Sequence, residues 1–142
     1  MIMARLEIKM IDSFLFETEL TIRTTDINLA NHVGNDTFVS LLQEARTRFF
    51  MHLGYSDRDI EGKAFVISDL AVLYKSQSYY GDRLKFEIGL RDFNKYGCDI
   101  LYQVTNSETN TLVLQAKTGM VFFDYTKNRV STIPEGFKSH FL

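Results

Sequence analysis

Polar and apolar residues alternate near the start of the chain and then change to a helical period. The alternation predicts a strand that buries one face, and its apolar members are Phe14, Phe16, Leu20 and Ile22. Residues 24–34 are polar and rich in turn-forming residues, which ends the strand pattern. We therefore expect one strand, followed by a loop that carries much of the candidate chemistry.

The loop leads into a helix. Apolar residues recur at helical spacing at Phe38, Leu42, Ala45 and Phe49. Asn35 is expected to cap the N-terminus, Asp36 complements the positive end of the helix dipole, and Gly54 stands where a C-terminal cap belongs. The pattern predicts a helix of about five turns from residue 35. Ser56 is expected to cap a further short turn over residues 57–60.

The remainder of the chain predicts strands. They cover residues 64–78, 83–93, 96–106 and 111–125, and the alternation is clearest in the second and third of these. Residues 120–123 are apolar on both faces, as in a central strand or in a strand that meets a partner chain. One strand, one long helix and four further strands pack most economically as an antiparallel sheet curled around the helix. The predicted fold class is therefore α+β.

Length, charge and cysteine content narrow the class of protein. A chain of 142 residues with 45% hydrophobic residues fits one domain over residues 1–142. A net charge of −2 and a pI near 5.9 disfavour nucleic acid as a partner. The most apolar segment is interrupted by Asp69 and is shorter than the ~20 residues of a membrane span. Because Cys98 is the only cysteine and residues 1–12 lack the apolar stretch of a signal peptide, we expect a cytoplasmic protein.

The loop and the start of the helix contain an ordered set of motifs. Residues 25–35 are Thr-Asp-Ile-Asn-Leu-Ala-Asn-His-Val-Gly-Asn, and residues 43–46 are Gln-Glu-Ala-Arg. Together they resemble the hotdog-fold acyl-CoA thioesterases of the 4-hydroxybenzoyl-CoA thioesterase type, whose pattern is Asp-x-Asp-x-x-Gly-His-Val-Asn-Asn-x-x-Tyr before a helix with Glu-x-Ala-Arg. The resemblance continues at residues 69–74, 80–82 and 134–135, and the order and spacing of these motifs make the combination specific.

The resemblance implies a fold, an activity and an assembly. In this family a curved antiparallel sheet wraps around one long central helix, and the protein hydrolyses a fatty or aryl acyl-CoA to the free acid and CoA. The resemblance implies no metal and no bound cofactor, and the net charge of −2 disfavours a membrane partner. Two subunits pair edge to edge and place the site at their boundary, so a homodimer or homotetramer is expected.

The chain departs from the family pattern at the position of the usual catalytic carboxylate. Counted back from His32, that Asp falls on Asn28, while Asp26 takes the place of the first Asp. The family's Gly before the His is Asn31, and its helix Glu is Gln43, with Glu44 one place on. An amide has no titratable proton near neutral pH, so Asn28 is neither nucleophile nor general base. The alternative function is therefore a non-catalytic module that binds acyl thioesters or lipids.

A thioesterase site remains feasible without that carboxylate. Free N–H groups at the start of the helix at Asn35 can stabilise the negative charge that develops on a thioester oxygen, and Gly34 lets a ligand approach the main chain. His32 is the natural base for activating water, with Asp26 to orient it and the Asn28 carbonyl to hold the water. A carboxylate could act instead of His32, and the candidates are Asp36, Glu44 and Asp69.

The expected site therefore has two parts. The catalytic candidates are Asp26, Asn28, His32 and Asn35, and the substrate-contacting candidates are Gly34, Asp36, Phe38, Glu44, Asp69 and Tyr74. The acyl tunnel is expected to be lined by Phe38, Leu42, Phe65 and Tyr74, and the candidate phosphate contacts are Lys75, Arg83 and Lys95.

Structural roles compete with several of these functional ones. Asp26 and Asn28 also suit Asx turns, and Arg46 is expected on a solvated helix face. His52 and His140 show no metal-ligand spacing, and Cys98 is expected in the core.

Overall fold

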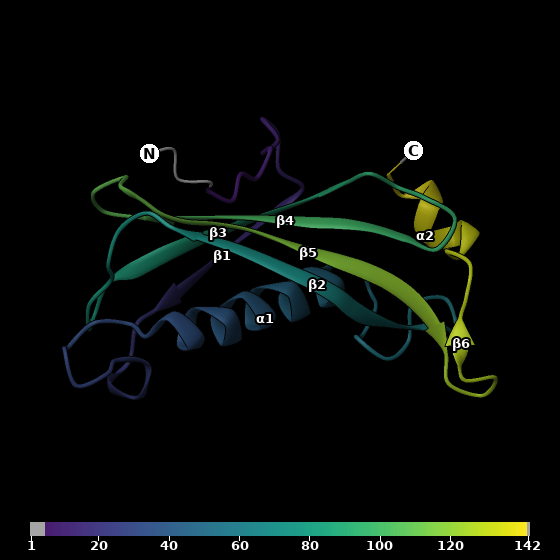
Figure 1. The fold of residues 1–142 in the computed structure, drawn as a ribbon, viewed down its shortest axis with the longest axis horizontal. Helices are drawn as coiled ribbons and strands as arrows, with labels where there is room; N and C mark the ends of the chain where they lie inside the picture. Colours follow the sequence, from purple (N-terminus) through teal and green to yellow (C-terminus); the bar gives the residue numbers. More distant parts are fainter. Residues whose placement is uncertain (1–4, 142) are drawn as a thin grey trace.

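One antiparallel sheet wraps around one long helix in the computed structural model, which describes residues 5–141 (Figure 1). Residues 1–4, part of the stretch in which no signal peptide was expected, and residue 142 lie outside the described residues. In chain order the elements are β1 (Phe16–Thr21), the 3-10 turn η1 (Thr24–Asp26), α1 (Asn35–His52), β2 (Ala64–Tyr74), β3 (Arg83–Arg91), β4 (Gly97–Asn106), β5 (Leu112–Asp124), β6 (Arg129–Val130) and α2 (Glu135–Ser139).

The strands are ordered β1-β3-β4-β5-β2 across the sheet, and every neighbouring pair is antiparallel. The two-residue strand β6 pairs with the end of β5. β1 and β2 therefore form the two long edges of the sheet, and α1 lies against one face between them (Figure 1). The α+β prediction of a curved sheet around one helix is confirmed.

The boundaries of α1 follow from its end residues. The N-cap is Gly34 rather than the expected Asn35, which is already the first helical residue. At the other end Gly54 has a φ of +88°, and the N–H groups of Gly54 and Tyr55 donate to the carbonyls of Met51 and Phe50. This pair of bonds is a Schellman motif, whose left-handed residue favours glycine. The buried face of α1 includes all four residues of the predicted stripe, together with Leu41 and Phe50.

The inner face of the sheet supplies the other half of the core. In β3 and β4 the predicted alternation is confirmed, because the side chains that face α1 are almost completely inaccessible. They are Leu84, Phe86, Ile88, Cys98, Ile100, Tyr102 and Val104. In β5, residues 120–123 are apolar on both faces because the strand is interior, between β4 and β2. β2, the neighbour of β5, is the edge strand on this side of the sheet.

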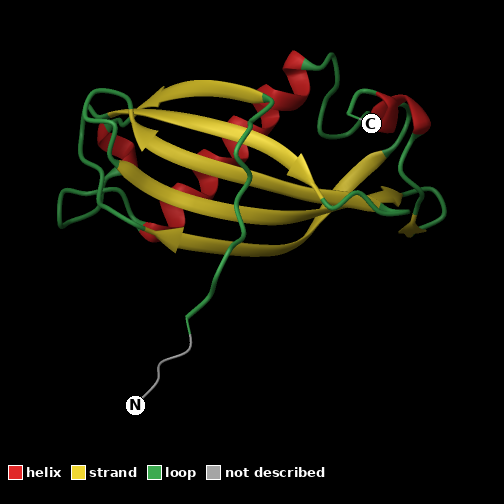
Figure 2. Ribbon diagram, turned by 90° about the horizontal axis from the view of Figure 1, so that it is seen from above, coloured by secondary structure: helices red, strands yellow, loops and turns green. Residues whose placement is uncertain are grey.

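The N-terminal segment, from Lys9 to Leu15, covers part of the sheet face that is opposite to α1 (Figure 2). The N–H of Leu15 donates to the carbonyl of Ile88, and the Arg91 guanidinium donates to the carbonyl of Lys9. Gly89 leaves room for this segment, because a Cβ at that position would overlap the side chain of Ile11. The segment therefore lies on the sheet face that does not contact α1.

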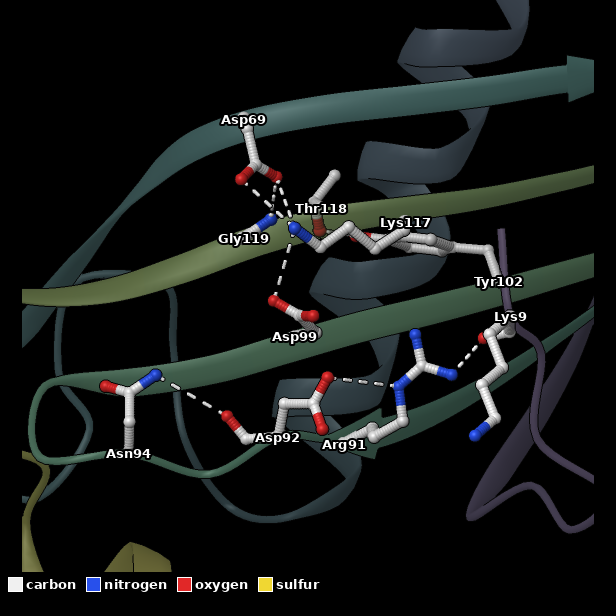
Figure 3. Close-up of polar contacts among 10 residues, drawn as sticks. All are labelled: Lys9, Asp69, Arg91, Asp92, Asn94, Asp99, Tyr102, Lys117, Thr118 and Gly119. Atoms are coloured by element: carbon white, nitrogen blue, oxygen red, sulfur yellow. Dashed lines mark hydrogen bonds and ion pairs between the residues drawn. The ribbon is translucent and has the colours of Figure 1, made fainter. Parts of the chain in front are cut away.

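β2 contains a bulge that turns Asp69 to the same outer face. The register with β5 shifts between Ile67 and Asp69. The Asp69 carboxylate accepts the N–H of Gly119 at 2.8 Å and lies 2.9 Å from the Lys117 ammonium, which also pairs with Asp99 (Figure 3). The bulge thus replaces one main-chain ladder bond by a side-chain acceptor.

Two further predictions differ from the structure, and two short elements were not predicted. β2 ends at Tyr74 rather than at residue 78, because the N–H groups of Lys75 and Ser76 both converge on the Val113 carbonyl and the chain then leaves the sheet. Residues 57–60 form tight turns between isolated bridges, not a helical turn. β6 and α2 were not predicted, because two and five residues are too few to show a period.

Among residues 5–141 no helix combines the length and apolarity needed to cross a membrane.

Candidate active site

The loop before α1 is held in place by the segment that follows β2. Val33 donates to the carbonyl of Ser78, and His32 forms an isolated bridge with Tyr79. Within the loop, the N–H of Asn28 donates to the His32 carbonyl at 2.9 Å. Asn31 adopts a left-handed conformation, with φ of 65°. The family has glycine at this position, and Asn tolerates the same conformation better than most residues.

The N-terminus of α1 presents unused hydrogen-bond donors. Gly34 has no side chain to cap the helix. Within residues 5–141, no acceptor bonds to the main-chain N–H groups of Asn35, Asp36 and Thr37. Such groups, together with the helix dipole, favour an anion or a developing negative charge. The expected set of oxyanion donors is therefore free to bind a ligand.

A cavity of about 250 Å³ adjoins these donors. One wall comes from the end of the loop and the start of α1, and the other comes from the end of β2 and the segment after it. In this order the lining residues are His32, Val33, Asn35, Phe38, Tyr74, Lys75, Ser76 and Gln77. The Tyr74 hydroxyl donates to the Asn35 carbonyl at 2.7 Å. Burial, and then the charge of Asp36, raise the pKa of Tyr74, so its hydroxyl remains a donor. We call this space the site cavity.

His32 is the base candidate that lines the site cavity. Its ring is half-buried, and Nδ1 lies 3.2 Å from the carbonyl of Val33. When Nδ1–H donates to that carbonyl, Nε2 keeps a lone pair that can accept a proton.

The side chain of Asn28 lies close to Gly34, the residue that precedes α1. The Asn28 carbonyl oxygen accepts the N–H of Ala30 at 2.9 Å, which forms an Asx turn. One lone pair of this oxygen is thus used within the loop, which is the Asx-turn role that the sequence also offers for Asn28. The amide nitrogen lies 3.9 Å from the point where a Cβ on Gly34 would stand, and that Cβ would be only 2.8 Å from Asp36 Oδ1. A side chain at position 34 would therefore displace the carboxylate of Asp36 from its present position.

The structure separates the four carboxylates proposed for the site. Asp26 is buried at 6% exposure, and its oxygens accept from the main chain and guanidinium of Arg23. It therefore does not orient His32, contrary to expectation. Glu44 pairs with Arg48 at 2.9 Å. Both carboxylates line a different cavity, of about 470 Å³, between α1 and β1.

The other two carboxylates lie on different parts of the fold. Asp69 belongs to the outer-face ion pair described above and not to the site cavity. Asp36 alone remains at the N-terminus of α1, close to Gly34 and within electrostatic range of Tyr74. If a carboxylate takes part beside His32, geometry therefore favours Asp36.

The residues expected to contact the CoA phosphates and the acyl group do not all lie at the site cavity. Lys75 lines the site cavity, whereas Arg83 is paired with Glu108 and Lys95 lies near α2. Of the tunnel residues, Phe38 and Tyr74 meet with ring centroids 6.1 Å apart. Leu42 lines a second cavity farther along α1, and Phe65 packs on Phe50.

Sequence reasoning missed several residues of this region. The cavity wall formed by Val33, Ser76 and Gln77 depends on where β2 ends, for which the sequence has no clear signal. The expectation for Arg46 was wrong: its guanidinium points into the protein and donates to the Tyr102 hydroxyl. Among residues 5–141, no group of three or more His, Cys, Asp or Glu side chains is arranged to hold a metal ion.

A comparison with models of known protein families identifies the family of this chain. The model of a thioesterase-like superfamily matches residues 22–141, from the end of β1 to the segment after α2. The chain belongs to the thioesterase-like superfamily. The matched range contains the loop, α1 and the whole site cavity. Comparison with curated proteins gave no match.

Solved structures agree on the fold of this superfamily member. A predicted thioesterase from Bacillus stearothermophilus is 21% identical, with a TM-score of 0.78, and the match covers 88% of this chain and 92% of that one. A DHNA-CoA thioesterase from Staphylococcus aureus is 19% identical, with a TM-score of 0.76 and coverage of 87% and 84%. A 1,4-dihydroxy-2-naphthoyl-CoA thioesterase from Synechocystis is 16% identical, with a TM-score of 0.71 and coverage of 87% and 93%. The shared architecture is the hotdog fold.

Proposed function

We propose that the chain is an acyl-CoA thioesterase that hydrolyses a fatty or aryl acyl-CoA to the free acid and CoA. The observation that carries this proposal is the adjacency of the unused N–H groups of α1 and of His32 around one cavity. Membership of the thioesterase-like superfamily supports the same reaction class. The aryl-CoA thioesterases among its structural neighbours make an aromatic acyl group as reasonable a substrate as an alkyl one.

In the proposed reaction the thioester carbonyl oxygen points at the N-terminus of α1. The N–H groups of Asn35 and Asp36 donate to it, and they stabilise the oxyanion more strongly than the neutral carbonyl. Phe38 and Tyr74 wall the cavity on its apolar side. Lys75, at the rim, is placed to meet a phosphate of CoA.

His32 is the proposed general base. Its Nε2 accepts a proton from water as the water oxygen attacks the thioester carbon. The tetrahedral intermediate then collapses, the carbon–sulfur bond breaks, and the CoA thiolate takes the proton from the imidazolium. No metal and no bound cofactor take part in this scheme.

One observation favours the second candidate function, a non-catalytic module that binds acyl thioesters. The amide of Asn28 replaces the family's carboxylate, and its carbonyl oxygen accepts the N–H of Ala30 within the loop. The same cavity and donors would bind a thioester without activating water. The two functions differ in turnover, because both bind acyl-CoA but only the enzyme releases free thiol.

We also infer that two copies pair along β2. This strand is an edge of the sheet, and within residues 5–141 its outer side has no strand partner. Exposed apolar side chains on its helix side are Ile67, Leu70 and Tyr74. The site cavity adjoins this edge, so pairing would complete its wall with a second copy. A homodimer, or a homotetramer made of two such pairs, is the proposed assembly.

A cytoplasmic location belongs to the same proposal. Its support is the single cysteine, Cys98, which is free and buried in the core. Disulfide bonds are the common device of small secreted domains, and this chain uses none.

The proposal is tested by thiol release from acyl-CoA with two histidine variants. His32→Ala is expected to lower kcat by ~10²-fold or more, because it removes the base. His52→Ala is the matched control, since His52 lies at the other end of α1 and packs on Phe16. Unchanged kcat in His32→Ala would remove His32 from the mechanism and make Asp36 the next residue to replace.

A further inference from the structure

A second cavity lies along the same seam between α1 and β2. It measures about 260 Å³, and its walls are mainly apolar: Val39, Leu42, Ile67 and Leu70. Val39 follows Phe38 of the site cavity, and Leu70 lies four residues before Tyr74 on β2. The two cavities are therefore neighbours along α1 and β2, and we call the second one the distal chamber.

The distal chamber also has polar lining residues, one of which is Gln43. Arg46 and Thr118 both line it. The Arg46 guanidinium donates to the Tyr102 hydroxyl at 3.1 Å, and that hydroxyl lies 2.8 Å from Thr118 Oγ1. Tyr102 and Thr118 lie on the neighbouring strands β4 and β5 (Figure 3), and both side chains are almost completely buried. The pair holds Arg46 in its inward orientation.

The guanidinium of Arg46 keeps unused hydrogen-bonding capacity. Within residues 5–141, no carboxylate lies within 4.0 Å of its guanidinium nitrogens, and its buried Nε has no acceptor. The carboxylate of Asp57 is close enough to act electrostatically on Tyr102, but it lies beyond ion-pair distance of Arg46. One of its oxygens accepts from Thr47, and the other is buried without a hydrogen-bond partner among residues 5–141. A guanidinium taken from water with donors left unused is costly unless a ligand supplies the acceptor. Carboxylate is the acceptor that best matches its fork of N–H groups.

We propose that the distal chamber receives the far end of the acyl group and that Arg46 selects acyl chains that end in a carboxylate. The inference rests on the proposed thioesterase function and names its substrate class, the CoA monothioester of a dicarboxylic acid. Arg46 lies 11 residues from Asn35 along α1, or about 16 Å at the helical rise. A chain of medium length is therefore needed to span both cavities.

The test compares suberyl-CoA with octanoyl-CoA, which have equal chain length and differ in the terminal carboxylate. Wild type is expected to prefer suberyl-CoA in kcat/KM by ~10-fold or more. Arg46→Met, which keeps the length and apolar body of the side chain, is expected to reduce that ratio to about one. Arg48→Met is the matched control, because Arg48 pairs with Glu44 on the other side of α1 and should leave the ratio unchanged.

Two further measurements keep the inference open to contradiction. If Arg46→Met does not fold, Thr118→Val should lower the ratio by removing the hydroxyl that orients the Arg46–Tyr102 pair, with the shape of the side chain preserved. Equal kcat/KM for both thioesters in wild type, or an undiminished ratio in Arg46→Met, overturns the inference. If wild type cleaves neither these two thioesters nor any other of a panel that includes aryl acyl-CoAs, the proposed function fails, and calorimetric binding of suberyl-CoA and octanoyl-CoA still decides whether Arg46 recognises the carboxylate.

Discussion

The hydroxyl of Tyr74, the last residue of β2, donates a 2.7 Å hydrogen bond to the carbonyl of Asn35, the first residue of α1. This contact joins the edge of the sheet to the helix end that carries the free N–H groups. Because the Asn35 carbonyl also belongs to the first turn of α1, the contact fixes the direction in which that turn points. The position of the proposed oxyanion donors therefore depends on where β2 ends.

Removing this bond should loosen the first turn of α1. Tyr74→Phe keeps the ring against Phe38 and deletes the donor, so we expect a loss of about 0.5–1.5 kcal/mol in the free energy of unfolding. The measurement is urea unfolding followed by circular dichroism. Tyr79→Phe is the control, because the only hydrogen bond of the Tyr79 hydroxyl within residues 5–141 is to the exposed side chain of Gln77. Equal stabilities of the two variants would show that the Tyr74 bond does not tie α1 to β2.

The ion pair at the β2 bulge should make stability depend on pH. Hydrogen bonds from Lys117 lower the pKa of Asp69, burial opposes the shift, and the Gly119 N–H lowers the pKa further. A carboxyl whose pKa is lower when folded stabilises the protein above its unfolded pKa, and the effect is lost as pH falls through the folded pKa. Asp69→Asn should therefore be less stable than wild type at neutral pH, by up to about 1 kcal/mol because Asp69 is largely exposed.

The difference between Asp69→Asn and wild type should vanish in acid, below the folded pKa of Asp69. Urea unfolding at a series of pH values measures it. Asp12→Asn is the control, since Asp12 is exposed and has no ion-pair or hydrogen-bond partner among residues 5–141. A stability difference that persists unchanged at low pH would mean that packing at the bulge, and not the charge of Asp69, produces it.

The single cysteine should be inert in the folded protein. Burial, with a smaller contribution from Asp99, raises the pKa of the Cys98 thiol to about 12, so almost no thiolate forms near neutral pH. A thiolate-specific reagent should therefore label the protein only at the rate at which it unfolds. Labelling in urea gives the full reaction as the reference. Rapid labelling of the native protein would show that β4 is more open than the structure indicates.

Pairing along β2 makes a prediction about size in solution. Leu70→Asp places a charge on the exposed apolar edge, so it should convert the assembly to monomers in sedimentation at micromolar concentration. Val130→Asp is the control, because Val130 is equally exposed, at 47% against 46%, but lies on β6. A wild-type monomer, or an assembly unaffected by Leu70→Asp, would contradict the proposed pairing.

The elements that the sequence predicted correctly are those long enough to show a period. The stripe from Phe38 to Phe49 defines α1, and strict alternation defines β3 and β4. Spacing cannot show on which side of α1 a neighbouring side chain emerges. Asp26 and Glu44 were therefore predicted as site residues, although they line the cavity between α1 and β1.

The interior polar cluster was also beyond sequence reasoning. Arg46 follows a charged pattern that usually marks a solvated face, and its inward orientation depends on Tyr102 from a strand far along the chain. By contrast, the motif around His32 did mark the loop, and Asn31 there adopts a left-handed conformation, which the glycine of the family pattern also tolerates. The order of motifs thus predicts the site region better than it predicts which side chains meet there.

The most direct test of the proposed enzyme is thiol release by wild type beside Asn28→Asp, on a panel of short-chain, long-chain, aromatic and carboxylate-terminated acyl-CoAs. Asn28→Asp restores the family's carboxylate next to Gly34. We expect wild type to release free thiol with multiple turnovers on at least one thioester, because the N-terminus of α1 and His32 suffice for hydrolysis. Turnover by Asn28→Asp alone, with wild type only binding the thioesters, would contradict this account and identify the natural protein as a thioester-binding module.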